Sequence, residues 1–185
     1  MQSCCRKTNY GFTLLEMILV LIIGSILTAI AIPAFHNWAP KYRVNGAARQ
    51  VFSEMMAARA KAISEGNDYV ITFNTGNNTY TIHDNDDKDD PPVQDTGEAV
   101  KTVNIANDYP GIGYDSGNPL TFIGSQVTFK PSGLVESSDL PSDTDGGDVY
   151  FKPTEDTTRQ DRQRRINVRL TGRIRLYKHT GSDWE

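Results

Sequence analysis

Residues 11 to 33 read GFTLLEMILVLIIGSILTAIAIP, and this stretch decides how the rest of the chain is organised. Met17 to Ile32 contain no charged residue, and the apolar segment counted from Phe12 is 21 residues long. A helix of that length rises about 30 Å, which matches the hydrocarbon thickness of a bilayer. Glu16 is the anomaly, because a charge at the bilayer centre costs roughly 2.5–3.5 kcal/mol on insertion scales.

Three kinds of N-terminal segment share this apolar pattern. Ala29-Ile30-Ala31 supplies the A-x-A pattern of a signal-peptide cleavage site, and a plain membrane anchor needs only the length. The third kind is a leader that is cut before the apolar helix, so that the helix is retained. Glu16 favours the third, since a carboxylate is a liability in the other two. Arg6 and Lys7 predict a cytoplasmic N-terminus with the body of the protein outside.

The residues around the anomaly also carry a family resemblance. Gly11 followed by Phe12-Thr13-Leu14-Leu15-Glu16 resembles the G-F-T-L-x-E signature of type IV prepilins and type II secretion pseudopilins, and Pro33 stands where many of them have a helix-kinking proline. The resemblance implies that a prepilin peptidase cleaves between Gly11 and Phe12 and that Phe12 is then N-methylated. It also implies that Glu16 pairs with the Phe12 amine of a neighbouring subunit, which neutralises two buried charges. The alternative is a glutamate that reaches the headgroups from one turn inside the bilayer.

Helical spacing continues beyond Pro40 and predicts one long helix, membrane-embedded in its first half and amphipathic in its second. We expect Gly66 to be its C-cap, and Pro33, Pro40 and Gly46 to mark places where it bends or melts. The apolar positions of the second half are Val44, Ala47, Ala48, Val51, Phe52, Met55, Ala58, Ala62 and Ile63.

From Asp68 onward the apolar period changes to two, which predicts a β-rich head. Residues 69–73 and 79–83 form a predicted hairpin around the 74–78 turn. Further strands are expected at 100–105, 126–130, 148–152, 165–170 and 174–178. The fold class is therefore α+β. The expected organisation is a cleaved leader over residues 1–11, a transmembrane and assembly helix over 12–39, and a head over 40–185 that includes the second half of the helix.

Two later segments resemble the GspH/FimT group of this superfamily. They are Ala57-Ala58-Arg59-Ala60-Lys61-Ala62-Ile63, and the turn Phe129-Lys130-Pro131-Ser132-Gly133, which resembles an F-x-P-x-G motif. A closing hairpin with Gly172-Arg173 follows. The resemblance implies a minor pilin or pseudopilin.

Two acidic loops, Asp84–Asp90 and Asp143–Asp148, are the candidates for metal binding. The first does not fit an EF-hand, because Lys88 falls at a ligand position and Asp89 at the position of the required glycine. Pseudopilins of the GspG kind hold calcium in such a loop, but this chain resembles GspH more, so we expect solvated acidic loops and no metal.

Both cysteines, Cys4 and Cys5, precede the apolar segment, which leaves the head without a disulfide. We expect no cofactor and no enzymatic activity, since His36, His83 and His179 are scattered and no nucleophile motif occurs.

The C-terminal end is basic, with a net charge of +7 between Arg159 and Lys178. Alternation predicts Ile166, Val168 and Leu170 inward. A three-residue loop, Thr171-Gly172-Arg173, would pair Leu170 with Ile174 and set Arg169 opposite Arg175. Like charges so placed repel each other, and a polyanion would relieve the repulsion. The candidate DNA-binding residues are Arg165, Arg169, Arg173, Arg175 and Lys178. Gly172-Arg173-Ile174-Arg175 resembles the basic stretch of some DNA-binding FimT minor pilins, although the acidic loops could instead neutralise this face.

The sequence thus predicts a structural subunit of a type IV pilus-family filament or of a type II secretion pseudopilus. Its expected partners are the prepilin peptidase, other pilin or pseudopilin subunits and the inner membrane. We expect a single-pass inner-membrane protein with a periplasmic head, which then enters a periplasmic pseudopilus or an extracellular pilus. The alternatives are a DNA-binding minor pilin that acts in DNA uptake, and an anchored periplasmic protein that does not polymerise.

Overall fold

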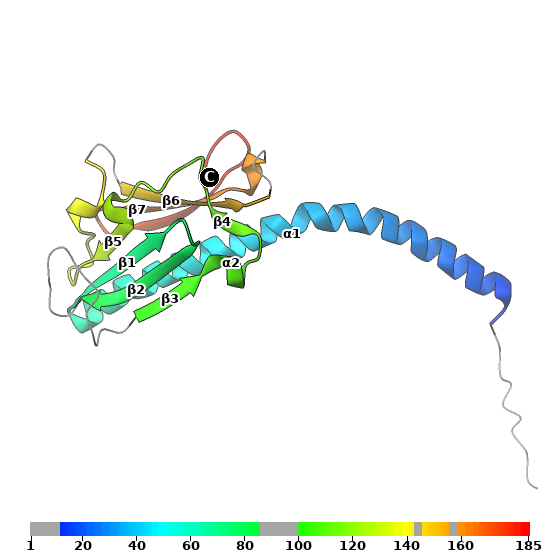
Figure 1. Ribbon diagram of the computed structural model, residues 1–185, viewed down its shortest axis with the longest axis horizontal. Coiled ribbons are helices and arrows are strands. Elements are labelled where there is room, and N and C mark those ends of the chain that lie inside the picture. The colour runs from blue at the N-terminus through cyan, green and yellow to red at the C-terminus, as the bar shows by residue number, and fades with distance from the viewer. Residues whose placement is uncertain (1–11, 86–99, 143–145, 156–158) are drawn as a thin grey trace, which may run out of the picture. The chain divides into compact units, whose positions relative to one another are not determined.

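The computed structural model describes residues 12–85, 100–142, 146–155 and 159–185 (Figure 1). It contains two compact units, Met1–Ala39 and Pro40–Glu185. The first unit consists, in its described part, of the beginning of one helix. The second holds the rest of that helix together with all the described strands.

The long helix α1 runs from Leu14 to Glu65. Thr13 caps its start, because its Oγ1 accepts a hydrogen bond from the Glu16 backbone N–H at 3.2 Å. Gly66 ends it with a φ of +77°, and its N–H donates to the Ala62 carbonyl, as expected of a C-cap glycine. The backbone stays helical through Pro33, Pro40 and Gly46. The predicted long helix is confirmed, and melting at these three positions is not observed.

The second half of α1 buries one face. The fully buried positions repeat at intervals of three and four residues, as a helix packed on one side requires. Phe52 is only partly buried and Ile63 is exposed, so these two predicted core positions lie at the border of the stripe. The buried residues are Val44, Ala47, Ala48, Val51, Met55, Ala58 and Ala62.

The strands form two antiparallel four-stranded sheets (Figure 1). The first has the order β3-β2-β1-β5 and the second β4-β6-β7-β8. The bounds of the first sheet are β1 Asp68–Asn74, β2 Thr79–Asn85, β3 Val100–Asn104 and β5 Gln126–Phe129. Those of the second are β4 Ile112–Tyr114, β6 Gly146–Pro153, β7 Arg164–Arg169 and β8 Ile174–Lys178. Every predicted strand is confirmed to within a few residues.

Short elements that have no periodic signal were not predicted. These are the helix α2 (Ile105–Asp108), the strand β4, and the 3-10 turns Ile123–Ser125, Ser137–Asp139 and Gln160–Arg162. Strand β4 depends on a distant contact: Asn78, with a φ of 54°, accepts a hydrogen bond from the Tyr114 N–H through its Oδ1 at 3.1 Å. A strand of three residues with a central glycine has too little alternation to be read from sequence.

One hydrophobic core joins the helix stripe to the inner faces of both sheets. Ile71 and Val127 come from the first sheet, and Val149 and Ile166 from the second; all four are fully buried. Burying side chains of this size contributes roughly 1.5–3 kcal/mol each. This core holds the head together without a disulfide.

The register of the last hairpin differs from the predicted one. Val168, not Leu170, lies opposite Ile174, and Asn167, not Arg169, lies opposite Arg175. The loop has three residues as predicted, but they are Leu170, Thr171 and Gly172, closed by the Arg169 N–H donating to the Arg173 carbonyl. Gly172 has a φ of +74°, and a three-residue hairpin loop places its left-handed residue last. Leu170 therefore lies in the loop and is 48% exposed, which corrects its predicted inward position.

Candidate functional site

The first, apolar part of α1 has exposed side chains along its whole length. Every side chain from Phe12 to Ile32 is exposed, and Phe12 itself is 73% exposed. Leu14–Ile32 has a mean hydropathy of 2.6 and is long and apolar enough to cross a membrane. Gly11 lies outside the described residues, so the bond between Gly11 and Phe12 has no structural description.

The polar side chains within this apolar segment are satisfied by the helix itself. The Ser25 hydroxyl donates to the Ile22 carbonyl at 2.8 Å, and the Thr28 hydroxyl donates to the Gly24 carbonyl at 2.7 Å. Such backbone bonds allow Ser and Thr to enter an apolar environment at little cost. Glu16 is then the one carboxylate that the segment carries.

Glu16 occupies the third helical position, behind the Thr13 cap. The spacing Thr13-x-x-Glu16 is that of a capping box, in which the glutamate side chain reaches back toward the N-cap. The helix dipole also favours a carboxylate in the first turn. The charge of Glu16 stands out in the sequence, whereas the capping role of Thr13 was not predicted, although the T-x-x-E spacing was present.

The three head motifs that carry the family resemblance meet at one junction. The Arg59 Nε donates a hydrogen bond to the Gly133 carbonyl at 2.9 Å. Gly172 packs against the same carbonyl, and a Cβ added to Gly172 would overlap it and stand 2.6 Å from the Arg59 Nε. The second half of α1, the turn after β5 and the β7–β8 hairpin are thus joined through Arg59, Gly133 and Gly172. We call these three residues the motif junction.

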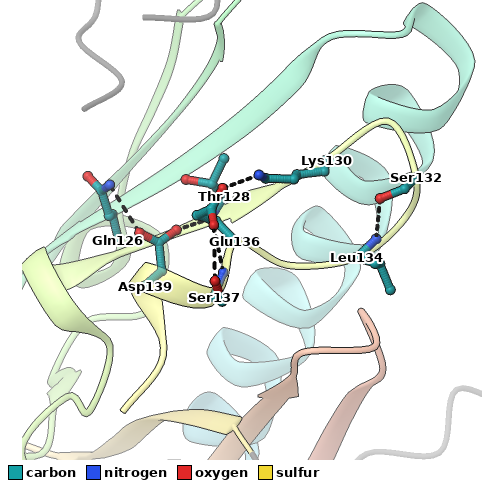
Figure 2. Close-up of polar contacts among 8 residues, drawn as sticks. All are labelled: Gln126, Thr128, Lys130, Ser132, Leu134, Glu136, Ser137 and Asp139. Atoms are coloured by element: carbon teal, nitrogen blue, oxygen red, sulfur yellow. Dashed lines mark hydrogen bonds and ion pairs between the residues drawn. The ribbon is translucent and has the colours of Figure 1, made fainter. Parts of the chain in front are cut away.

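A polar network holds the turn that supplies Gly133 (Figure 2). The Gly133 N–H donates to the Lys130 carbonyl at 2.8 Å, and the Lys130 N–H to the Leu134 carbonyl at 2.9 Å. Lys130 and Glu136 form an ion pair, and the Lys130 ammonium lowers the pKa of Glu136.

Asp139 closes this network from inside the head (Figure 2). It is 4% exposed and accepts hydrogen bonds from the Thr128 N–H at 2.7 Å and from the Gln126 Nε2 at 3.3 Å. Burial raises its pKa despite these bonds, because the charged form loses its hydration. The network ties the Ser137–Asp139 turn to β5.

The predicted anion-binding residues do not form one free face. Arg165, Arg169 and Arg175 share the outer face of the second sheet, and Arg173 is exposed at the hairpin end. Lys178 has the alternation of Leu176 and therefore lies on the other face of β8.

Two aromatic rings contact Arg165 on this outer face. The Arg165 guanidinium lies 4.5 Å from the centre of the Tyr177 ring and 5.1 Å from that of Trp184. Its Nε is 3.8 Å from Asp148 Oδ1. The Arg175 Nη1 donates to the Tyr177 hydroxyl at 3.3 Å, which lowers the pKa of Tyr177. Because Asn167 faces Arg175, the predicted pairing of Arg169 with Arg175, which suggested a polyanion partner, does not occur.

Most residues of the two acidic loops lie outside the part of the chain that the structure describes. Residues 86–99 and 143–145 are not described, so the calcium alternative for these loops lies outside the structure. Among the residues that the structure does describe, no group of three or more His, Cys, Asp or Glu side chains is placed to hold a metal ion.

The chain matches the models of known protein families. The family described as Type II transport protein GspH matches residues 47–172, which include all three residues of the motif junction. The chain belongs to the GspH family. The prokaryotic N-terminal methylation motif matches residues 6–32. This GspH-family chain therefore combines a prepilin-type N-terminus with a GspH head.

Solved structures show the same fold at low sequence identity. The minor pseudopilin EpsH of the type II secretion system of Vibrio cholerae aligns with a TM-score of 0.50 and 15% identity, over 74% of this chain and 97% of that one. The type IV minor pilin FimU of Pseudomonas aeruginosa aligns with a TM-score of 0.50 and 13% identity, over 80% of this chain and 96% of that one.

A curated relative matches part of the sequence. A fimbrial protein of Pseudomonas aeruginosa is 36% identical over 76 residues, which are 41% of this chain and 49% of that protein. The chain thus spans about half the length of this relative. Family, N-terminal motif and fold together support a structural pilus or pseudopilus subunit and give the DNA-binding alternative no support.

Proposed function

We propose that this GspH-family chain is a filament subunit that is processed by a prepilin peptidase and assembled through its N-terminal helix. The filament is a type II secretion pseudopilus or a pilus of the type IV family. The observation that carries the proposal is an exposed apolar helix with a single carboxylate, Glu16, in its first turn, continuous with the helix of a GspH head.

Processing takes place between Gly11 and Phe12 in this proposal. Cleavage there leaves Phe12 as the first residue, one position before the Thr13 cap and four before Glu16. The new amine lies close to the start of α1, and N-methylation keeps it cationic. Arg6 and Lys7 hold the leader on the cytoplasmic side of the inner membrane, and the head then lies in the periplasm.

Assembly depends on neutralising Glu16 in the filament. When the helices of neighbouring subunits pack together, water is excluded from Glu16, and an unpaired charge there costs several kcal/mol. The Phe12 amine of a neighbouring subunit supplies the opposite charge. The exposed apolar side chains of Phe12–Ile32 supply the contact area between helices.

The test is the mass of the mature chain. We expect membranes and sheared filaments of cells that have a prepilin peptidase to contain a chain that begins with N-methylated Phe12. Replacing Gly11 by a bulky residue should leave the full precursor in the membrane fraction. A mature chain that begins at Ile32, after the Ala29-Ile30-Ala31 site, would identify a signal peptide and overturn the proposal.

A further inference from the structure

Two large aromatic side chains follow the apolar segment at helical spacing. Phe35 is 64% exposed and Trp38 is 58% exposed, and their ring centres lie 6.5 Å apart. Residues three positions apart lie on the same side of a helix. The two rings therefore form one exposed cluster just beyond the candidate membrane span Leu14–Ile32.

The place of this cluster along the helix matches the interface of a bilayer. At ~1.5 Å per residue, Phe35 and Trp38 lie about 4.5 and 9 Å beyond Ile32. The headgroup region on each side of the hydrocarbon is roughly 5–7 Å thick. Helical side chains also tilt toward the N-terminus, which is the direction of the apolar segment here, so the Trp38 ring lies closer to the membrane than its Cα.

We propose that Phe35 and Trp38 form an interfacial anchor that binds the headgroup layer of the lipid bilayer and fixes the depth of the helix. We call this pair the aromatic anchor. Tryptophan favours this layer because its ring is apolar while its indole N–H finds polar partners there. This inference rests on the proposed function, since it requires that the apolar segment span a membrane.

The aromatic anchor has a consequence for Glu16. With Ile32 at one hydrocarbon boundary, a thickness of about 30 Å reaches back roughly 20 residues, to Thr13. Glu16 then lies only about 5 Å inside the opposite boundary, where its carboxylate can still reach the headgroups. Moving the helix toward the cytoplasm would draw the indole of Trp38 into hydrocarbon, and moving it outward would sink Glu16 deeper. The two residues therefore fix the depth of the helix from opposite ends.

The chain offers a matched pair of reporters, because its two tryptophans are Trp38 and Trp184. Trp184→Phe leaves Trp38 as the reporter, and Trp38→Phe leaves Trp184, which lies against Arg165 in the head. Each full-length variant is reconstituted into vesicles of phosphatidylethanolamine and phosphatidylglycerol. These vesicles contain lipids brominated either near the carbonyl end or near the methyl end of the acyl chains. Flotation of the vesicles reports whether the chain is inserted.

We expect Trp38 fluorescence to be quenched, and more strongly by bromine near the carbonyl end than near the methyl end. Trp184 fluorescence should be quenched by neither lipid. Equal quenching of the two variants, stronger quenching by the deep bromine, or unquenched Trp38 in vesicles that carry the chain would overturn the aromatic anchor. In the last case the rings face another protein helix, while membrane insertion stands. A chain that does not float refutes the membrane-spanning segment itself, and with it the proposed function.

Discussion

Arg59 in α1 donates a hydrogen bond to the carbonyl of Gly133 in the turn after β5, over a distance of 2.9 Å. Gly172 of the last hairpin packs against the same carbonyl. One backbone oxygen thus joins three segments that are far apart in the sequence. This geometry gives a physical reason for an arginine in the helix, a glycine in the turn and a glycine in the hairpin.

Removing the arginine should loosen the junction. Arg59→Ala leaves the Gly133 carbonyl, which is partly buried, without its donor, and we expect a loss of about 1–3 kcal/mol in the free energy of unfolding. The measurement is thermal unfolding of the full chain in mild detergent, followed by near-ultraviolet circular dichroism of the aromatic residues of the head. Arg49→Ala is the control, because Arg49 is exposed on the same helix, and it should change stability by less than about 0.5 kcal/mol. Equal effects of the two substitutions would contradict the role of the junction.

Alanine substitutions at Gly172 and Gly66 distinguish the effect of backbone strain from that of steric overlap. Their φ angles are +74° and +77°, so an added Cβ is strained to a similar degree at both, by roughly 1–2 kcal/mol. A Cβ at Gly66 meets no atom within 4 Å, whereas one at Gly172 overlaps the Gly133 carbonyl. We therefore expect Gly172→Ala to lower the unfolding temperature clearly more than Gly66→Ala. The same shift for both would show that the hairpin can move away from the turn.

The register of this hairpin marks the limit of what the sequence could predict. Alternation correctly assigned the strands and their inward residues Ile166 and Val168, because a period of two is a local property. The position of the loop depends on which residue of the hairpin has a positive φ. Among the residues of β7, the loop and β8, that residue is Gly172. Placing Gly172 last in the loop moves Leu170 out of the strand, which local alternation could not indicate.

The outer face of the second sheet, which carries Arg165, Arg169 and Arg175, shows the same limit for contacts between distant parts of the chain. Composition correctly located the basic residues, and alternation put Arg165 on the outer face. Trp184, which covers Arg165, comes from the end of the chain, where no periodic pattern exists. The family motif at Gly11–Glu16 could be recognised from sequence because the N-terminal methylation motif consists of particular residue types in a fixed order.

Asp139 and Glu136 should give the head opposite responses to pH. Burial raises the pKa of Asp139, so its contribution to stability is fully present below the unfolded pKa and is lost as the pH rises through the folded pKa. The pKa of Glu136 is lowered by Lys130, so its contribution is present above the unfolded pKa and is lost as the pH falls through the folded pKa.

The comparison is made with amide variants between about pH 3 and pH 7, the range over which carboxylates titrate. The unfolding temperature of the native chain minus that of Asp139→Asn should fall as the pH rises. The same difference for Glu136→Gln should fall as the pH decreases. Asparagine keeps an acceptor for the Thr128 N–H but replaces the oxygen that accepts from Gln126. That loss does not vary with pH, so the slope of the difference reports the charge. Slopes of the same sign for both variants would contradict the assignment.

Glu16 has two possible tasks, capping its own helix and pairing with the Phe12 amine of a neighbour, and two substitutions separate them. Glu16→Gln keeps the capping-box pattern with Thr13, because glutamine serves at that position as glutamate does, but it removes the charge. Glu16→Leu removes the charge and the polar side chain of the capping box, although its backbone N–H can still donate to the Thr13 hydroxyl. If charge pairing drives assembly, both variants should insert into the membrane and both should be depleted from sheared filaments to the same extent. The measurement is the ratio of filament to membrane protein, with the mass of the N-terminus determined in each fraction. If glutamine assembles normally and leucine does not, the polar side chain acts through the capping box and the filament contains no charge pair with Phe12. The physical expectation is the first outcome, since an uncompensated Phe12 amine buried between helices costs several kcal/mol, whereas a lost cap costs about 1 kcal/mol.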